Sequence, residues 1–278
     1  MPAARSALAQ LVKSGSAVAD ALRPSRPGVA ILIYHRVGAG SGLEVDLPTS
    51  LFEAQMAMLA GEHEVVSLGV ALERLSGPEP PRAHDPRRPP VVITFDDGTA
   101  DFVDVALPIL ERHRLPVTLY AATGFIEDGT PFPDDGRPVS WSALADACSS
   151  GLLDVGSHTH GHRLLDRLSE AEVAAELDRS IALIGDRLGQ APVDFAYPKA
   201  IPGSPAAERA VRARFRSAAL AGTRSNPYGR TDLYRLSRSP IQVGDGTRWF
   251  ARKAAGGMGL EDDLRRVLNK RRYANATT

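Results

Sequence analysis

The chain has 278 residues, of which 43% are hydrophobic, and its 33 acidic residues equal its 33 basic ones. This balance argues against a protein whose main partner is nucleic acid or another polyanion. The length allows one large α/β domain or two small ones. The single cysteine, Cys148, cannot form an internal disulfide, so we expect it to be a small buried side chain of the core.

The first 27 residues are predicted to be an N-terminal extension. Residues 6–22 have the pattern of an amphipathic helix, but Lys13, Ser14 and Gly15 interrupt the apolar run that a secretory signal requires. No run reaches the roughly 18 apolar residues that cross a bilayer. We expect this segment to pack on the domain or to fray, with attachment to a membrane surface as the alternative. A cytoplasmic protein is the prediction that follows.

Predicted strands and helices alternate through the rest of the chain. The expected strands are residues 29–34, 64–68, 91–95, 117–121, 153–157, 193–196, 215–221 and 239–243. The expected helices are residues 51–60, 70–75, 102–113, 140–149, 169–188 and 205–213. This alternation predicts a parallel sheet of βαβ units, and seven or eight strands favour a distorted (β/α) barrel over a doubly wound sheet. We expect the barrel to span residues 28–250, and residues 251–278 to form a helix with a basic, solvated tail.

Two motifs carry the chemistry. The segment TFDDG (94–98) places two adjacent carboxylates directly after a predicted strand, and SHTHGH (157–162) supplies imidazoles four residues apart. One aspartate with two histidines is a sensible ligand set for a catalytic divalent metal, and it leaves the second aspartate free to act as a base. Each motif alone has a plainer interpretation, a tight turn or a pair of surface histidines. Both follow predicted strands, where α/β enzymes assemble their sites, and together they favour a hydrolase.

Other residues around these motifs are expected to play supporting parts. Thr159 stands where the zincin pattern HExxH needs its glutamate, so that pattern does not fit. If the loop turns helically, His160 points away from the ion, because residues i and i+2 do not share a helix face. Ser157 and Thr159 are expected to hydrogen bond within the loop or behind the ligands. The histidines expected at the surface are His63, His84 and His113.

The two motifs, with Phe195-Ala196-Tyr197-Pro198, resemble those of the polysaccharide deacetylases, the NodB homology domain or carbohydrate esterase family 4. The resemblance covers about residues 28 to 245. It implies a distorted (β/α) barrel that removes N-acetyl, and sometimes O-acetyl, groups from sugars. By position it implies that Asp97, His158 and His162 hold a divalent metal and that Asp96 is the general base. Zinc suits such a ligand set best, with cobalt, nickel and manganese physically allowed.

The segment Ile31-Leu32-Ile33-Tyr34-His35-Arg36-Val37 resembles the opening of the poly-N-acetylglucosamine deacetylase subgroup, in which the order of the barrel strands is circularly permuted. That resemblance implies that His35 is the general acid, which must protonate the departing amine. Many members of the family take their acid from a histidine near the end of the domain. Here all seven histidines lie at or before position 162. The alternative is a structural His35 whose ring bonds a backbone carbonyl.

The sequence departs from the family near its third motif. Other members have an arginine at the position of Ala196, where it orients the base, and an aromatic residue and a glycine at Lys199 and Ala200. The backbone N–H of Lys199 can still stabilise an oxyanion, because that role belongs to the peptide. Tyr197 is expected to line the sugar site or, equally, to be a core aromatic. The cations close enough in sequence to replace the missing arginine are Arg224, Arg230, Arg235 and Arg238.

These observations predict a metal-dependent hydrolase acting on an N-acetylated glycan or amino sugar. Two alternatives remain open at this point. The barrel could act on a small intracellular or lipid-linked acylated metabolite, or the departures near Lys199 could leave a glycan-binding module without catalysis. Neither a nucleic-acid partner nor a transmembrane segment is expected.

Overall fold

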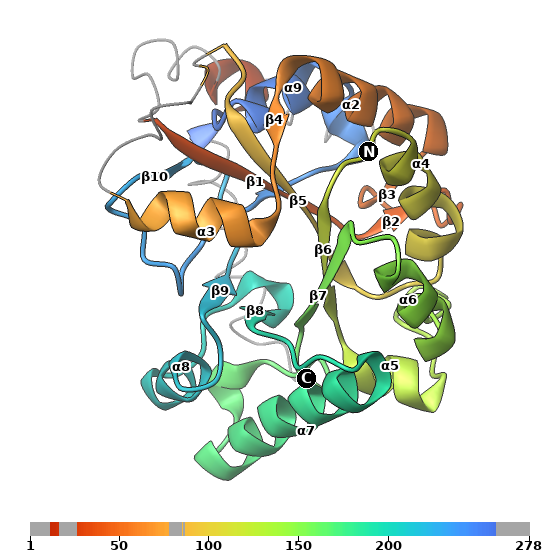
Figure 1. Ribbon diagram of the computed structural model, residues 1–278, viewed down its shortest axis with the longest axis vertical. Coiled ribbons are helices and arrows are strands. Elements are labelled where there is room, and N and C mark those ends of the chain that lie inside the picture. Colours follow the sequence, from red (N-terminus) through yellow and green to blue (C-terminus); the bar gives the residue numbers. More distant parts are fainter. Residues whose placement is uncertain (1–11, 17–26, 78–84, 86, 260–278) are drawn as a thin grey trace.

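The computed structural model describes residues 12–16, 27–77, 85 and 87–259. Its centre is a curled, mainly parallel sheet, and helices surround that sheet on the outside (Figure 1). The predicted distorted (β/α) barrel is therefore confirmed. The strands of the main sheet are β1 (Gly28–Tyr34), β4 (Glu64–Val65), β5 (Pro90–Asp97), β6 (Val117–Ala121), β7 (Leu153–Ser157), β8 (Asp194–Ala196), β9 (Ser217–Ala219), β10 (Asn226–Pro227) and β11 (Ser239–Pro240).

Strands β1, β5, β6, β7, β8 and β9 are parallel neighbours in this order. Strand β5 is buried over nearly its whole length, as its run of branched residues leads one to expect for a parallel strand covered on both faces. In register, Asp97 lies beside Ala121, and Ser157 lies beside both Ala121 and Phe195. The carboxyl ends of these strands therefore meet at one edge, and the two motifs that follow them are brought side by side.

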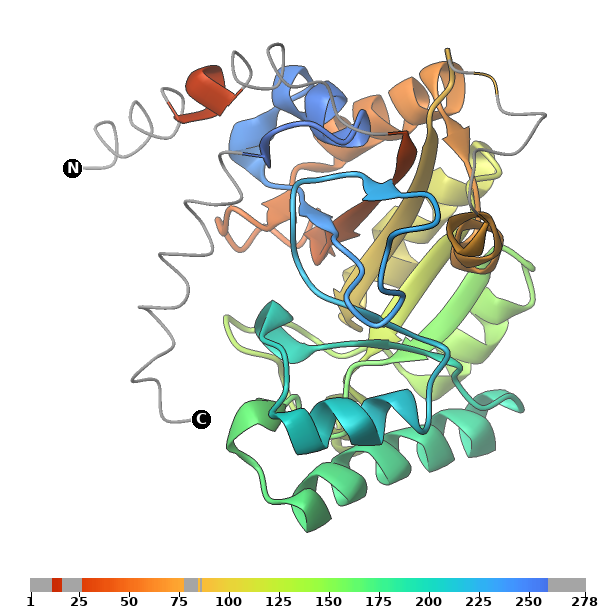
Figure 2. The same ribbon diagram turned by 90° about the vertical axis from the view of Figure 1, so that its left-hand side faces the viewer.

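The last part of the barrel closes the sheet. The N–H of Leu220 donates to Leu236 (2.8 Å), and the N–H of Leu236 donates back to Ala218 (3.0 Å). A few residues on, β11 pairs in parallel with β1, and the N–H of Ile241 donates to Ile33 (3.0 Å). Residues 233–241, here called the closing segment, thus lie between β9 and β1 and join the two ends of the curled sheet (Figure 2).

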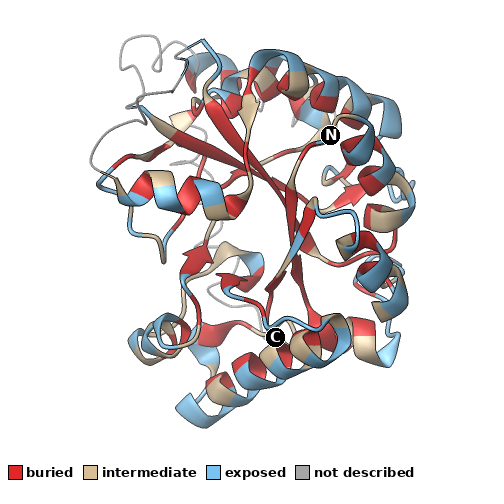
Figure 3. Cartoon of the chain, viewed as in Figure 1, coloured by how far each residue is buried: buried red, intermediate tan, exposed pale blue. Residues whose placement is uncertain are grey.

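The helices pack their apolar sides on the sheet, and buried residues are concentrated on the strands and on the inner faces of the helices (Figure 3). Helix α9 extends past residue 250, the end predicted for the barrel, and buries Phe250 and Ala254 in the main core. A separate two-stranded parallel sheet, β2 (Arg36–Val37) with β3 (Asp46–Leu47), follows β1. The helices are α2 (Thr49–Glu62), α3 (Leu68–Ser76), α4 (Leu107–Arg112), α5 (Thr123–Asp128), α6 (Trp141–Cys148), α7 (Glu170–Leu188), α8 (Pro205–Arg212) and α9 (Arg248–Ala254), with short turns η1 (Phe102–Ala106), η2 (Leu165–Arg167), η3 (Pro198–Ala200) and η4 (Val243–Asp245).

Several predicted boundaries were wrong. The strand expected at 64–68 is only β4, because Ser67 caps the N-terminus of α3 by accepting a hydrogen bond from Val70. The helix expected at 102–113 begins as a π-helical turn, η1, before α4. The strands expected at 215–221 and 239–243 shorten to β9 and β11. Within the chain that the structure describes, no helix is both long and apolar enough to cross a membrane.

The ends of the chain are described only in part. Residues 12–16 are helical, and the buried ammonium of Lys13 forms an ion pair with Asp245 at 2.6 Å. The N-terminal segment therefore packs on the domain at this point. The remainder of the predicted 6–22 helix, His84 and the predicted basic tail lie outside the described residues.

Candidate metal site and its surroundings

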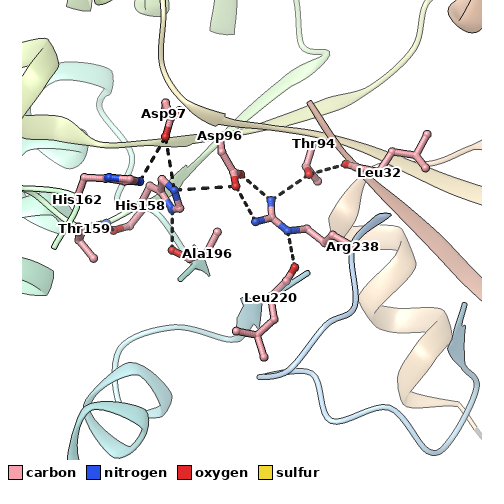
Figure 4. A network of polar contacts seen from close by, with 11 residues as sticks. Leu32, Thr94, Asp96, Asp97, His158, Thr159, His162, Ala196, Leu220 and Arg238 are labelled. Carbon is pink, nitrogen blue, oxygen red and sulfur yellow. Dashed lines mark hydrogen bonds and ion pairs between the residues drawn. The ribbon is translucent and has the colours of Figure 1, made fainter. Parts of the chain in front are cut away.

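Asp97, His158 and His162 converge at the carboxyl edge of the sheet (Figure 4). The Oδ1 atom of Asp97 lies 3.5 Å from Nε2 of His162 and 3.7 Å from Nε2 of His158. One ligand atom from each residue lies within 4.8 Å of the other two. A carboxylate and two imidazoles at this spacing can coordinate one divalent ion and leave positions open for other ligands. The residue types and their geometry thus fit a catalytic metal.

The ring of His158 is already oriented for such a role. Its Nδ1 atom donates to the carbonyl of Ala196 at 2.8 Å, since a carbonyl can only accept. This hydrogen bond places the proton on Nδ1 and leaves the lone pair of Nε2 directed at Asp97 and His162. His158 is almost fully buried, so its ring cannot turn freely. Ala196 therefore orients the ring of His158 through its backbone carbonyl, and this does not depend on its side chain.

The loop that carries His158 and His162 is fixed by hydrogen bonds to helices α7 and α5. Its residues Thr159 and His162 have positive φ values, 66° and 54°, so the loop is irregular and the helical turn considered for it is not observed. The N–H of Gly161 donates to Oε2 of Glu176 on α7 at 2.6 Å. The ring of His160 hydrogen bonds with Thr123 at the start of α5 (3.0 Å) and does not join the ligand cluster.

The second carboxylate of the DDG motif, Asp96, lies beside this cluster and is buried. Its Oδ1 and Oδ2 accept hydrogen bonds from Nη1 and Nη2 of Arg238, at 2.6 and 2.8 Å (Figure 4). Burial by itself would raise the pKa of Asp96, but the charge of Arg238, with that of His158 when its ring is protonated, more than offsets it and lowers the pKa to about 2. Asp96 is therefore a carboxylate at neutral pH, as a general base must be.

Strands β1 and β5 are parallel, and Tyr34 pairs with Phe95. The next residues on these two segments, His35 after β1 and Asp96 on β5, therefore lie side by side. The positive charge of a protonated His35 would help to lower the pKa of Asp96. Among the described groups, its Nδ1 atom is buried without a hydrogen-bond partner. The alternative was a structural His35 whose ring bonds a backbone carbonyl, and Nδ1 makes no such hydrogen bond.

Comparisons with known proteins agree with this geometry. The family model for polysaccharide deacetylase matches residues 83–217, which include both motifs. Residues 83–217 thus match a polysaccharide deacetylase domain. Its fold is similar to that of IcaB from Ammonifex degensii, with 25% identity and a TM-score of 0.70 over 83% of this chain and 98% of IcaB. This likeness is consistent with the permuted subgroup that the opening motif resembles.

Two further relatives extend the comparison. The Streptococcus pyogenes deacetylase PplD, solved in complex with acetate, shares the fold at 22% identity and a TM-score of 0.66, over 79% of this chain and 94% of PplD. The protein YxkH of Bacillus subtilis (strain 168) is 25% identical over 169 residues, 60% of this chain and 55% of YxkH. The chain thus spans about half the length of the curated relatives that it matches.

The loop after β8 lies close to the ligands. Lys199 and Ala200 both have left-handed backbones, with φ of 53° and 55°, and Lys199 is exposed. The pKa of His162 falls to about 4, chiefly through burial; a protonated His158 and, with a smaller part, Lys199 lower it further. Tyr197 is buried against Phe195, with ring centroids 5.0 Å apart, so the interpretation as a core aromatic is favoured over a wall of the sugar site.

The structure also places several other residues for which the sequence made a prediction. Of the four arginines considered, Arg238 contacts Asp96, whereas Arg235 pairs with Glu208 at the surface. The prediction that His63 lies at the surface was wrong: its ring is buried and its Nδ1 atom hydrogen bonds with Pro89. Cys148 is half-buried, and burial raises the pKa of its thiol, which does not suit a nucleophile.

Proposed function

We propose that this protein is a metal-dependent hydrolase that removes N-acetyl groups from an N-acetylated glycan or amino sugar. The observation that carries the proposal is the cluster of Asp97, His158 and His162, with the ionised Asp96 next to it. The match to the deacetylase family supports the hydrolysis of a sugar amide. The likeness in fold to IcaB, at 25% sequence identity, supports the same assignment.

Asp97, His158 and His162 would hold the ion, with Zn²⁺ preferred and Co²⁺, Ni²⁺ or Mn²⁺ able to replace it. When bound, such an ion acts as a Lewis acid and lowers the pKa of water from about 15.7 towards 7. Asp97 would contribute negative charge, and the neutral Nε2 atoms of the two histidines would complete the set. The hydrogen bond from His158 to Ala196 keeps that ring in the required tautomer.

The other residues would move protons and stabilise charge. Asp96 would accept the proton from the attacking water, since it is ionised and has lone pairs left beside its bonds to Arg238. The backbone N–H of Lys199 would stabilise the oxygen that becomes negative as water adds to the amide carbon. His35 would donate a proton to the nitrogen, so that the C–N bond breaks to give a free amine and acetate. Tyr197 would serve the shape of the loop and not contact the sugar, because its ring is buried.

Acetate release from short N-acetylglucosamine oligomers by the zinc-loaded protein tests this proposal. We expect release by the natural chain and none by Asp96→Asn or His158→Ala. A panel of O-acetyl esters and of lipid- and nucleotide-linked N-acetyl sugars, assayed the same way, identifies the preferred substrate. Binding of the oligomers without acetate from any member of the panel would contradict the proposal and indicate a glycan-binding module instead.

A further inference from the structure

Two carboxylates stand beside the same imidazole in this site. The Oδ1 atom of Asp97 is 3.7 Å from Nε2 of His158, and the Oδ2 atom of Asp96 is 3.9 Å from the same nitrogen. A divalent ion held by that nitrogen attracts both carboxylates, and a catalytic zinc site can expand from four ligands to five. Distance from His158 therefore does not decide which aspartate becomes a ligand and which stays free to act as a base.

The two carboxylates differ in their other partners. Both oxygens of Asp96 are engaged by the planar fork of Arg238, at 2.6 and 2.8 Å, whereas the oxygen of Asp97 faces the imidazoles (Figure 4). To swing onto the ion, Asp96 would have to give up at least one of these bonds. That would leave a buried guanidinium N–H without an acceptor, which is costly because it keeps the full desolvation penalty.

Arg238 is itself held on every side. Its Nε atom donates to the carbonyl of Leu220 (3.2 Å), and its Nη1 atom also donates to Oγ1 of Thr94 (3.1 Å), whose hydroxyl donates in turn to Leu32 (2.6 Å). The guanidinium lies over the ring of Tyr120, 4.9 Å from its centroid, and the side chain is almost fully buried. Two strands and the closing segment thus fix the fork before any ion is bound.

We propose that Arg238 determines the different roles of the two aspartates. It prevents Asp96 from coordinating the metal, so that Asp97 alone is the carboxylate ligand and Asp96 remains available as the base. This inference rests on the proposed function and makes Arg238 a positioning residue. Arg238 lies on the closing segment, beyond residues 83–217 that match the deacetylase family. The arrangement also gives the closing segment a part in the chemistry, since it brings this cation to the base.

Cobalt binding tests the inference without any turnover. Co²⁺ is titrated into metal-free natural protein, Arg238→Met, Arg238→Met with Asp96→Asn, and Arg235→Met, and the visible absorption is recorded. Arg235 is the matched control, because it lies on the same segment but pairs with Glu208 at the surface. In Arg238→Met we expect an altered cobalt spectrum and an affinity about tenfold higher, from the added carboxylate ligand, within the 10–100-fold range of effects around metal sites. The double variant, Arg238→Met with Asp96→Asn, should have the same cobalt spectrum as the natural protein. The control Arg235→Met should have that spectrum as well.

Turnover provides the second readout. In Arg238→Met we expect kcat to fall about 100-fold, the loss expected when a general base is misplaced, with KM changed less than about threefold. Arg238→Lys keeps the buried charge and should fold even if the methionine variant does not; its single ammonium cannot engage both oxygens equally, so intermediate values are expected. A cobalt spectrum in Arg238→Lys and Arg238→Met identical to that of the natural protein, or undiminished kcat, would overturn the inference alone. Failure of the natural protein to take up cobalt would overturn the proposed metal site, and this inference with it.

Discussion

Asp96 and Arg238 are 142 residues apart in the sequence, yet their side chains form two parallel hydrogen bonds inside the barrel. The pair joins β5, which carries the first motif, to the closing segment at the other end of the domain. Because the pair is fully buried, neither residue can lose its partner without leaving an uncompensated charge. The carboxylate therefore stays ionised and in place beside the metal ligands, and this separates its chemical role from that of its neighbour Asp97.

The two adjacent aspartates should respond differently to substitution. Asp96→Asn should retain metal close to one equivalent and lose acetate release by about 100-fold or more, because an amide cannot accept the proton. Asp97→Ala should lose both metal and activity, because it removes a direct ligand. Metal content by elemental analysis and acetate release on the same samples provide the comparison. Equal metal loss in both variants would contradict the division of roles.

Features that depend on short stretches of sequence, such as strands and the motifs at their ends, were mostly predicted. The strand-end positions of Asp96, Asp97, His158 and His162 followed from apolar runs that end in polar motifs, and the structure brings these residues together. Strand lengths were overestimated where a cap such as Ser67 ends a strand early.

The partner of Asp96 could not be derived from the sequence. Arg238 was one of four arginines considered, and nothing in its local sequence distinguishes it from Arg235. Only the pairing of the closing segment with β1 and β9 turns the side chain of Arg238 inward. The buried ring of His63 was missed for the same reason, since its partner, Pro89, comes from a distant loop. Long-range pairing, which sequence periodicity does not encode, decides these cases.

If His35 protonates the leaving group, its importance should depend on that group. His35→Gln should lower kcat on an N-acetyl sugar by about 100-fold, because an amine cannot leave as its anion. On 4-nitrophenyl acetate, whose phenolate leaves without a proton, the loss should be less than about threefold. Initial rates on both substrates with the zinc-loaded protein provide the test. Losses of the same size on amide and ester would show that His35 does not act as the acid.

Gly156, the fourth residue of β7, should not tolerate a side chain. A Cβ atom there would lie 2.6 Å from Cδ1 of the buried Tyr120 ring and 2.9 Å from the backbone oxygen of Asp194. Neither neighbour can yield easily in a packed core, so Gly156→Ala should destabilise the fold by about 2 kcal/mol or more. Urea denaturation measures this.

Gly61 is the matched control for that substitution. It lies in α2, where an added Cβ meets nothing within 4 Å. Gly61→Ala should be neutral or stabilise the fold by up to about 1 kcal/mol, because alanine is the better helix former. Similar losses at both glycines would mean that the close approach at Tyr120 is relieved by movement of the backbone.

The buried ion pairs of Asp245 should make stability depend on acid pH. Its carboxylate lies between the ammonium groups of Lys13 and Lys253, at 2.6 and 2.8 Å. Burial alone would raise the pKa of Asp245, but the two lysines offset this and lower it. The folded protein thus holds this proton less tightly than the unfolded chain, whose aspartates have a pKa of about 3.9. The stabilisation is complete above that value and is lost as the pH falls through the lower, folded pKa.

Asp245→Asn should therefore cost about 3 kcal/mol at pH 7, the lower end of the range for breaking a buried pair, since it removes the carboxylate that both buried ammonium groups contact. The difference in unfolding free energy between this variant and the natural protein should shrink as the pH is lowered from 5 to 2. The control is Arg112→Met, which breaks the exposed pair with Glu53 and should change stability by less than about 0.5 kcal/mol at any pH. Urea denaturation at a series of pH values gives these differences, and a constant difference across the series would show that Asp245 does not carry the acid sensitivity.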